Sequence, residues 1–161
     1  DYAVSKLAME YAAHLFDSAL PITIARPFNY TGRGQGEHFL VPKIVAHFQR
    51  LAPRIELGNL DVARDFSDVR AVVRAYRHLL QTPPAGETVN VCSGVSTSLR
   101  EVIAMAQRIT GHELEITVNP AFVRDTEVRT LCGDNRRLRS LIGDWSPIPL
   151  ESTLRWMLEA A

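Results

Sequence analysis

The stretch Ile22-Thr23-Ile24-Ala25-Arg26-Pro27-Phe28-Asn29-Tyr30-Thr31-Gly32-Arg33-Gly34-Gln35-Gly36 carries the local signals that decide the fold class. It begins with a short apolar run rich in β-branched residues, which predicts a strand over 22–25. The proline and glycines of 27–36 then predict a loop. Apolar residues recur at helical spacing over 2–18 before this stretch and over 38–51 after it. A strand set between two helices indicates an α/β protein.

The rest of the chain continues this alternation. We expect an extended segment around 64–67 and short strands at 55–57, 88–91 and 114–118. Helices are expected at 68–80, 98–110, 134–143 and 150–159. Asp68 and Asp134 are expected to cap two of these helices, and Ser98-Leu99-Arg100-Glu101 has the capping-box pattern. About four short strands, with no strand before the first helix, predict an incomplete parallel sheet.

Composition limits the classes of function. The 161 residues carry no net charge and amount to one domain. We see no basic patch for nucleic acid and no apolar run long enough for a membrane. Cys92 and Cys132 lack metal-ligand spacing, so we expect no metal and two free thiols in a reducing, cytoplasmic compartment. The chain has neither a signal peptide nor an initiator Met, which predicts the C-terminal part of a longer protein.

Tyr2 and Lys6 form the pair with the clearest chemical potential. Residues four apart share one face of a helix, so the phenol and the ammonium are expected to be neighbours. A phenol beside a cation can give a proton to a carbonyl oxygen while hydride arrives at the carbon. The same spacing also arises by chance, when an amphipathic Tyr lies beside a snorkelling Lys. The pair alone therefore leaves both interpretations open.

The order of the following segments resembles the extended short-chain dehydrogenase/reductase family, and within it the nucleotide-sugar enzymes. The resemblance covers essentially the whole chain. The matching stretches are Tyr2 with Lys6, 25–35, Leu57-Gly58-Asn59, Arg64-Asp65-Phe66-Ser67-Asp68-Val69, Asn90-Val91-Cys92-Ser93-Gly94 and Gly133-Asp134. It implies that residues 1–161 are the C-terminal half of a Rossmann-type enzyme, with an incomplete sheet and a substrate-binding subdomain. The N-terminal Rossmann half, with its Gly-rich loop and catalytic Ser or Thr, would be absent.

The same resemblance implies roles for particular residues. Tyr2 would be the catalytic acid/base, and Lys6 would hold the nicotinamide ribose of NADP or NAD. Pro27 and Phe28 would line the nicotinamide. Substrate contacts would come from Asn29, Val41, Lys43, Arg64, Arg124 and Glu127. Arg suits the diphosphate because its planar fork makes charge-assisted hydrogen bonds, and a Glu can accept both ribose hydroxyls.

Each of the substrate assignments has an ordinary structural alternative. Asn29 could be a turn residue in a Gly-rich loop. Lys43 could be a solvated residue early in its helix. Arg124 and Glu127 could form an exposed ion pair of little energetic value. Arg124-Asp125-Thr126-Glu127 resembles the Arg-Pro-x-Glu of the family, with Asp125 in the place of proline.

Within the family, the stretch from Arg64 to Tyr76 and the stretch 90–94 resemble GDP-4-keto-6-deoxy-D-mannose reductases most closely. Such an enzyme would reduce the C4 keto group to give GDP-D-rhamnose. Residues 57–61 and Lys43 look more like a GDP-mannose 4,6-dehydratase, which is the alternative activity. A further alternative is a non-catalytic module that binds a nucleotide sugar.

A homodimer through the first helix is also expected, because Ala8, Met9, Ala12 and Ala13 lie beside the Tyr2 face. The alternative is that this face packs inside the monomer.

Overall fold

The computed structural model describes residues 1–81, 84–123 and 128–159, and it is a mixed α/β structure with parallel strands, as expected. The elements follow one another along the chain as α1 (Tyr2–His14), β1 (Thr23–Pro27), β2 (Asn29–Thr31), α2 (Leu40–Gln49), β3 (Arg54–Leu57), β4 (Ala63–Asp68), α3 (Val69–Gln81), β5 (Glu87–Val91), β6 (Ser96–Ser98), α4 (Leu99–Thr110), β7 (Glu115–Val118), a short 3₁₀ turn (Pro120–Phe122), β8 (Thr130–Leu131), α5 (Arg136–Ile142) and α6 (Leu150–Leu158).

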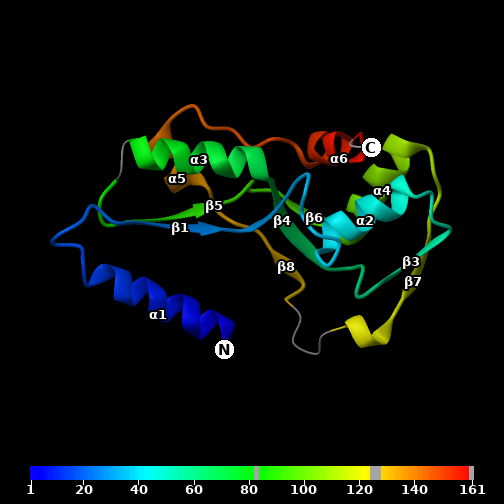
Figure 1. Ribbon diagram of the computed structural model, residues 1–161, viewed down its shortest axis with the longest axis horizontal. Helices are drawn as coiled ribbons and strands as arrows, with labels where there is room; N and C mark the ends of the chain where they lie inside the picture. Colours follow the sequence, from blue (N-terminus) through cyan, green and yellow to red (C-terminus); the bar gives the residue numbers. More distant parts are fainter. Residues whose placement is uncertain (82–83, 124–127, 160–161) are drawn as a thin grey trace.

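Strand β4 is the centre of the architecture. It pairs in parallel with β2 and β8 and antiparallel with β6. Two smaller parallel pairs flank it, β1 with β5 and β3 with β7. Figure 1 shows β1 and β5 side by side with α3 and α5 above them, and α2, α4 and α6 grouped at the other side of β4. We call the first group the strand lobe (β1, β5, α3, α5) and the second the helical lobe (α2, α4, α6, β3, β7).

Each lobe has its own apolar core. In the helical lobe the buried side chains include Ile44, Phe48, Leu57, Ile103 and Leu154. In the strand lobe they include Val72, Leu79, Val89, Leu138 and Trp145. Helix α3 buries Ala71, Val72, Ala75 and Leu79, the spacing of one helical face. Burial of these side chains, at about 25 cal/mol per Å² of apolar surface, is the main force that forms both lobes.

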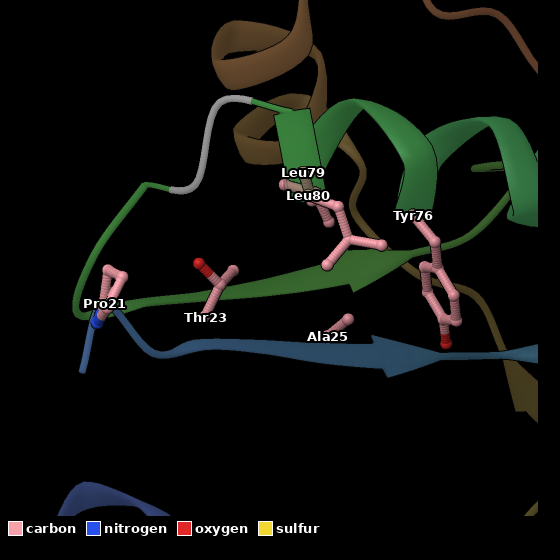
Figure 2. A pocket seen from close by; sticks show the side chains of 6 residues that line it. All are labelled: Pro21, Thr23, Ala25, Tyr76, Leu79 and Leu80. Carbon is pink, nitrogen blue, oxygen red and sulfur yellow. The ribbon is translucent and has the colours of Figure 1, made fainter. Parts of the chain in front are cut away.

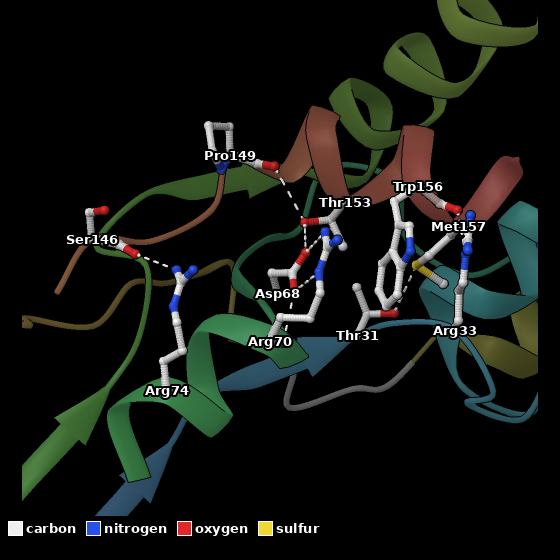
Figure 3. Close-up of polar contacts among 10 residues, drawn as sticks. All are labelled: Thr31, Arg33, Asp68, Arg70, Arg74, Ser146, Pro149, Thr153, Trp156 and Met157. Atoms are coloured by element: carbon white, nitrogen blue, oxygen red, sulfur yellow. Dashed lines mark hydrogen bonds and ion pairs between the residues drawn. The ribbon is translucent and has the colours of Figure 1, made fainter. Parts of the chain in front are cut away.

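Polar contacts join α6 to the end of β4 and the start of α3 (Figure 3). The buried carboxylate of Asp68 accepts hydrogen bonds from the Thr153 hydroxyl and from the backbone N–H and guanidinium of Arg70. The guanidinium of Arg70 stacks 3.7 Å from the ring centroid of Trp156. Arg33 lies 4.9 Å from the same ring and donates to the Trp156 carbonyl. These contacts fix the C-terminal helix against the central strand.

Several sequence expectations are confirmed by this arrangement. Ser98 and Glu101 form a full capping box at the start of α4, and Gly111 ends that helix with φ of 69°. Asp68 accepts the backbone N–H of Arg70 in the first turn of α3, as expected for a cap. Strands lie at 23–27, 54–57, 87–91 and 115–118, and the extended segment is β4.

Other expectations were wrong. The first helix ends at His14 rather than at residue 18, with turns over 15–19. The predicted loop 27–36 contains β2, because its residues pair with β4 rather than turning locally. Strands β2, β6 and β8 were missed, so the described chain has eight strands instead of about four. The N-cap of α5 is Asn135, although Asp134 still accepts the N–H of Arg136. Segments of two or three residues are defined by pairing across the sheet, which periodicity does not reveal.

Candidate active site

Helix α1 presents Tyr2 and Lys6 together on its surface. The Lys6 ammonium lies 5.6 Å from the centroid of the Tyr2 ring, as the four-residue spacing predicts. Tyr2 is 76% exposed, and α1 has no buried residue. A cation within about 6 Å of an aromatic ring is attracted to it. The pair is thus preassembled and open to a ligand.

Helix α1 is tied to β1 by a bidentate ion pair between Glu10 and Arg26. The hydrogen bonds from Arg26 lower the pKa of the Glu10 carboxyl, and those to Glu10 raise the pKa of Arg26. Arg26 immediately precedes Pro27 at the carboxyl end of β1. In the view of Figure 1, the N-terminal end of α1 lies toward this same end of β1.

The carboxyl end of β1 is where the chain passes from one sheet to the next. Pro27 pairs with Val91 of β5, and Phe28 donates its N–H to the Val91 carbonyl at 3.0 Å. Asn29 then pairs with Phe66 of β4. Pro27 is exposed and Phe28 half-buried, so both apolar side chains are accessible beside a strand end. In open α/β sheets, ligands bind outside the carboxyl ends of strands.

The register between β2 and β4 brings Asn29 close to Arg64. Because Asn29 lies opposite Phe66, and because side chains alternate along a strand, Asn29 and Arg64 occupy the same face of this sheet. The Arg64 guanidinium donates to the carbonyls of Ala63 at 2.9 Å and Arg129 at 3.4 Å. Asn29 is exposed and lies in a strand, so it is not the turn residue of the alternative interpretation.

Lys43 and Val41 occupy the first turn of α2. The Lys43 ammonium donates to the Glu56 carbonyl at 2.7 Å and lies 4.9 Å from the Phe122 ring centroid. It is therefore a bridging residue rather than a freely solvated one. The Val41 side chain is buried in the core of the helical lobe, which leaves its main chain as the part that could contact a ligand.

Arg124 and Glu127 lie outside the described residues. The described residues on either side of them do reach the predicted site. Phe122 contacts Lys43, and the Arg129 carbonyl accepts a hydrogen bond from Arg64.

Sequence reasoning missed two residues at this site, Asp65 and Gly133. Asp65 is fully buried, and it accepts hydrogen bonds from two loops. A Cβ at Gly133 would lie 2.4 Å from the Cys92 sulfur and 3.0 Å from the Phe28 ring. The sequence signal that could have identified Asp65 is an acidic residue within a segment expected to be extended. Nothing local marked Gly133, because the close approach is made by distant parts of the chain.

Two cavities described by the structure are lined by other residues. One of about 240 Å³ lies between the start of β1 and α3 and is lined by Pro21, Thr23, Ala25, Tyr76, Leu79 and Leu80 (Figure 2). Burial and the neighbouring Tyr30 raise the pKa of Tyr76, which keeps this phenol neutral. Another cavity, of about 200 Å³, lies between the 32–37 loop, α2 and Met157. Among the predicted site residues, Tyr2 and Lys6 are exposed on α1, and Pro27 and Asn29 are exposed where the chain passes from β1 to β2.

Two kinds of feature are absent from residues 1–81, 84–123 and 128–159. No group of three His, Cys, Asp or Glu side chains there is placed to hold a metal ion. No helix there has the length and apolar character needed to cross a membrane.

Comparison with known proteins identifies the relatives of this fold and site. The family model described as GDP-mannose 4,6 dehydratase matches residues 1–157. GDP-6-deoxy-D-mannose reductase of Pseudomonas aeruginosa is 39% identical over 165 residues, covering 98% of this chain and 54% of that protein. GDP-6-deoxy-D-talose 4-dehydrogenase of Aggregatibacter actinomycetemcomitans is 36% identical over 143 residues, covering 89% and 49%.

A solved structure shows the same relationship in three dimensions. RMD from Pseudomonas aeruginosa, complexed with NADPH, has a TM-score of 0.90 and 38% identity, covering 98% of this chain and 54% of that one. The chain spans about half the length of the curated relatives it matches.

Proposed function

The chain belongs to the GDP-mannose 4,6 dehydratase family, and on that premise we propose that it forms the nucleotide-sugar half of an NAD(P)-dependent oxidoreductase. The proposed reaction reduces the C4 keto group of GDP-4-keto-6-deoxy-D-mannose to give GDP-D-rhamnose. The observation that carries the proposal is the exposed Tyr2–Lys6 pair, with the ammonium 5.6 Å from the ring. The identity to a GDP-6-deoxy-D-mannose reductase supports the choice of substrate.

The residues of this chain have distinct tasks in that reaction. The Tyr2 hydroxyl donates its proton to the sugar O4 as C4 is reduced, and the Lys6 ammonium stabilises the phenolate that remains. Asn29 and Arg64, on one face of their sheet, bind the diphosphate through an amide and a guanidinium. Lys43, Arg124 and Glu127, with the main chain at Val41, complete the contacts to the nucleotide.

The part of a cofactor site that this chain contains fits a nicotinamide. Pro27 and Phe28 offer accessible apolar faces at the end of β1, and Lys6 offers an ammonium for a ribose hydroxyl. When bound in its reduced form, NADPH or NADH would supply the hydride that C4 receives. We propose that a Rossmann half, of which residues 1–161 are the C-terminal counterpart, provides the remaining contacts to the cofactor.

Replacement of Tyr2 by Phe tests the proposal. The assay uses the chain together with any coding sequence upstream of Asp1, with the keto sugar and NADPH as substrates. We expect the rate of NADPH oxidation to fall by about 10²–10⁴-fold, because the general acid is lost. Tyr11→Phe is the matched control, since Tyr11 is an exposed tyrosine of the same helix, and it should leave the rate unchanged. A Tyr2→Phe enzyme that works at the parental rate would refute the mechanism.

The configuration at C4 of the product is a separate question, because the names of the two curated relatives described above differ at this carbon. Talose is the C4 epimer of mannose, so a relative named for GDP-6-deoxy-D-talose supports the epimeric product as an alternative. Proton NMR of the product separates the two. An axial H4, with large couplings to H3 and H5, is expected for GDP-D-rhamnose, and an equatorial H4 would indicate the talose product.

Two alternative functions expected from the sequence also need a test. The family model favours a GDP-mannose 4,6-dehydratase, which would convert GDP-mannose itself without net oxidation. Incubation with GDP-mannose and detection of a 4-keto product tests this activity. A non-catalytic nucleotide-sugar module would bind GDP but not NADPH, which calorimetry with each ligand on the 161-residue chain distinguishes.

We also propose that α1 forms a homodimer interface and that the protein acts in the cytoplasm. The helix has no buried residue, and it and the following turn expose the apolar side chains of Leu7, Met9, Leu15 and Phe16, which offer a surface for a second copy of the chain. Both cysteines are free, as expected in a reducing compartment. Ala12→Glu should convert a dimer to a monomer in analytical ultracentrifugation. A parental protein that sediments as a monomer would contradict the interface.

A further inference from the structure

Asp65 is a buried carboxylate to which two separate segments of the chain donate hydrogen bonds. Its side chain is completely inaccessible to solvent. The Oδ1 atom accepts from the Ser93 N–H at 2.8 Å and from the Ser93 hydroxyl at 2.6 Å. The Oδ2 atom accepts from the N–H groups of Gly94 at 2.9 Å and Gly133 at 3.2 Å. The Cys132 thiol lies 4.0 Å from the same oxygen.

No ion pair found within the described residues involves Asp65. Its charge is therefore balanced by main-chain and hydroxyl donors rather than by an arginine or a lysine. A buried carboxylate is costly unless such donors surround it. The donors lie in two loops, 92–95 and 132–135, and Asp65 holds both of them against β4. The Asn135 amide adds to this clamp by donating to the carbonyls of Cys92 and Ser93.

Loop 132–135 lies next to Phe28, and loop 92–95 follows the residue to which the Phe28 main chain is hydrogen-bonded. Loop 92–95 follows directly after Val91, whose carbonyl accepts the Phe28 N–H. Loop 132–135 brings Gly133 against the Phe28 ring, close enough that a Cβ there would lie 3.0 Å from it. On the other side of the strand, Arg64 is the neighbour of Asp65 and points to the opposite face. Asp65 thus connects loops 92–95 and 132–135, which lie near Phe28, to β4, the strand that carries Arg64.

We infer that Asp65 is a positioning residue, which fixes Phe28 of the cofactor contact relative to Arg64 of the substrate contact by clamping loops 92–95 and 132–135 to β4. This inference rests on the proposed function for the roles of Phe28 and Arg64. The clamp itself does not depend on any ligand, so the inference about the clamp and the proposed function can fail separately.

Asp65→Asn is the decisive variant, and Asp68→Asn is its matched control. The Asn side chain has one acceptor oxygen and one NH₂ group, whereas the carboxylate has two acceptor oxygens. If the oxygen faces Ser93, the NH₂ group faces the N–H groups of Gly94 and Gly133, and if the amide is flipped, the NH₂ group faces Ser93. In either orientation one set of donors loses its acceptor. Asp68 is an equally buried carboxylate in the same strand, but it binds α6 and α3 instead of the loops. Both variants should lose thermal stability, and only Asp65→Asn should disturb the site.

The measurements are made on the 161-residue chain at a temperature where each variant is folded. In Asp65→Asn we expect hydrogen exchange at the amides of Ser93, Gly94 and Gly133 to accelerate by about tenfold, the equivalent of one lost hydrogen bond. We also expect NMR signals of the Phe28 ring and the Arg64 side chain to shift or broaden. Asp68→Asn should leave all of these signals unchanged. Ser93→Ala removes one donor to Asp65, together with the acceptor of the Val95 N–H, so it gives a milder version should Asp65→Asn not fold.

The last measurement is the steady-state kinetics of the enzyme. With the complete enzyme, Asp65→Asn should raise the KM for both cofactor and sugar nucleotide, by about tenfold, and Asp68→Asn should raise neither. The inference is overturned if Phe28 and Arg64 keep their parental signals in Asp65→Asn, or if both variants change them equally. A parental enzyme that does not reduce the keto sugar would instead refute the proposed function and leave the NMR result to decide on the clamp.

Discussion

The hydroxyl of Thr153 in α6 donates a hydrogen bond of 2.7 Å to the carboxylate of Asp68, at the junction of β4 and α3 (Figure 3). The two residues are 85 positions apart in the chain, and both are buried. This contact joins the last helix to the strand that carries Arg64 and Asp65. It therefore connects the stability of the C-terminal helix with that of the junction between β4 and α3.

Replacing Thr153 by Val should destabilise the chain by about 1.5–3 kcal/mol, because a buried carboxylate loses a hydrogen bond while the volume of the side chain is kept. Urea unfolding followed by circular dichroism measures this loss. Ser152→Ala, at the exposed neighbouring position of α6, is the control and should change the free energy of unfolding by less than about 0.5 kcal/mol. Equal stabilities for the two variants would contradict this role of Thr153.

Stability should fall in acid, in part through Asp68. Burial alone would raise the pKa of this carboxyl, but the hydrogen bonds from Arg70 and Thr153 outweigh it and lower the pKa. A lowered pKa in the folded state means that the stabilisation is present above the ordinary carboxyl value of about 3.9 and is lost as the pH falls below it. Urea midpoints measured from about pH 5 downward should therefore decline, less steeply in Asp68→Asn.

Asp134 provides a spectroscopic check on acid titration. Hydrogen bonds from Arg136 lower its pKa to about 2. Carbon-13 NMR of the carboxyl groups should show Asp134 still ionised when exposed aspartates without a partner are already protonated. Arg136→Gln should return the Asp134 titration toward the ordinary range, and an unchanged midpoint in that variant would rule out Arg136 as the cause.

Gly133→Ala should destabilise the chain by about 1–3 kcal/mol, the usual cost of overpacking. The added Cβ would lie 2.7 Å from the Cβ of Cys92, which is fixed to the backbone and has no rotamer that relieves the contact. Gly36→Ala is a suitable control, because its Cβ would meet only the exposed ring of His38, which can rotate away. Thermal unfolding should separate the two variants, and a Gly133→Ala chain as stable as Gly36→Ala would show that the 132–135 loop yields freely.

The two thiols should differ in reactivity. Cys92 is buried, and burial together with the nearby Asp65 carboxylate raises its pKa to about 12. Cys132 is exposed, although partial desolvation and Asp65 raise its pKa as well. Since the thiolate is the reacting form, a disulfide reagent at neutral pH should label Cys132 first and Cys92 only on unfolding. Cys132→Ser should remove the faster phase, and two thiols that react at one rate in the folded chain would contradict this order.

Local sequence signals predicted most helices and strands, because these elements form through interactions between residues that are close together in the chain. The capping box of Ser98 and Glu101, the β-branched residues of β1 and the apolar face of α3 each act within a few residues. Strands β2, β6 and β8 were not predicted, since their residues are extended only because β4 lies beside them. The Tyr2–Lys6 pair was predicted from helical spacing, whereas the proximity of Asn29 to Arg64 follows from a register between strands.

The sequence by itself therefore determined the alternation of strands and helices and the Tyr2–Lys6 pair, since helix period and strand preference are properties of neighbouring residues. Only the tertiary structure decided that Asp65 would hold two loops, that Gly133 would lie against Cys92 and Phe28, and that Thr153 would bind Asp68. Those contacts join residues separated by tens of positions. Their formation depends on how β4 pairs with its neighbours, which no local pattern specifies.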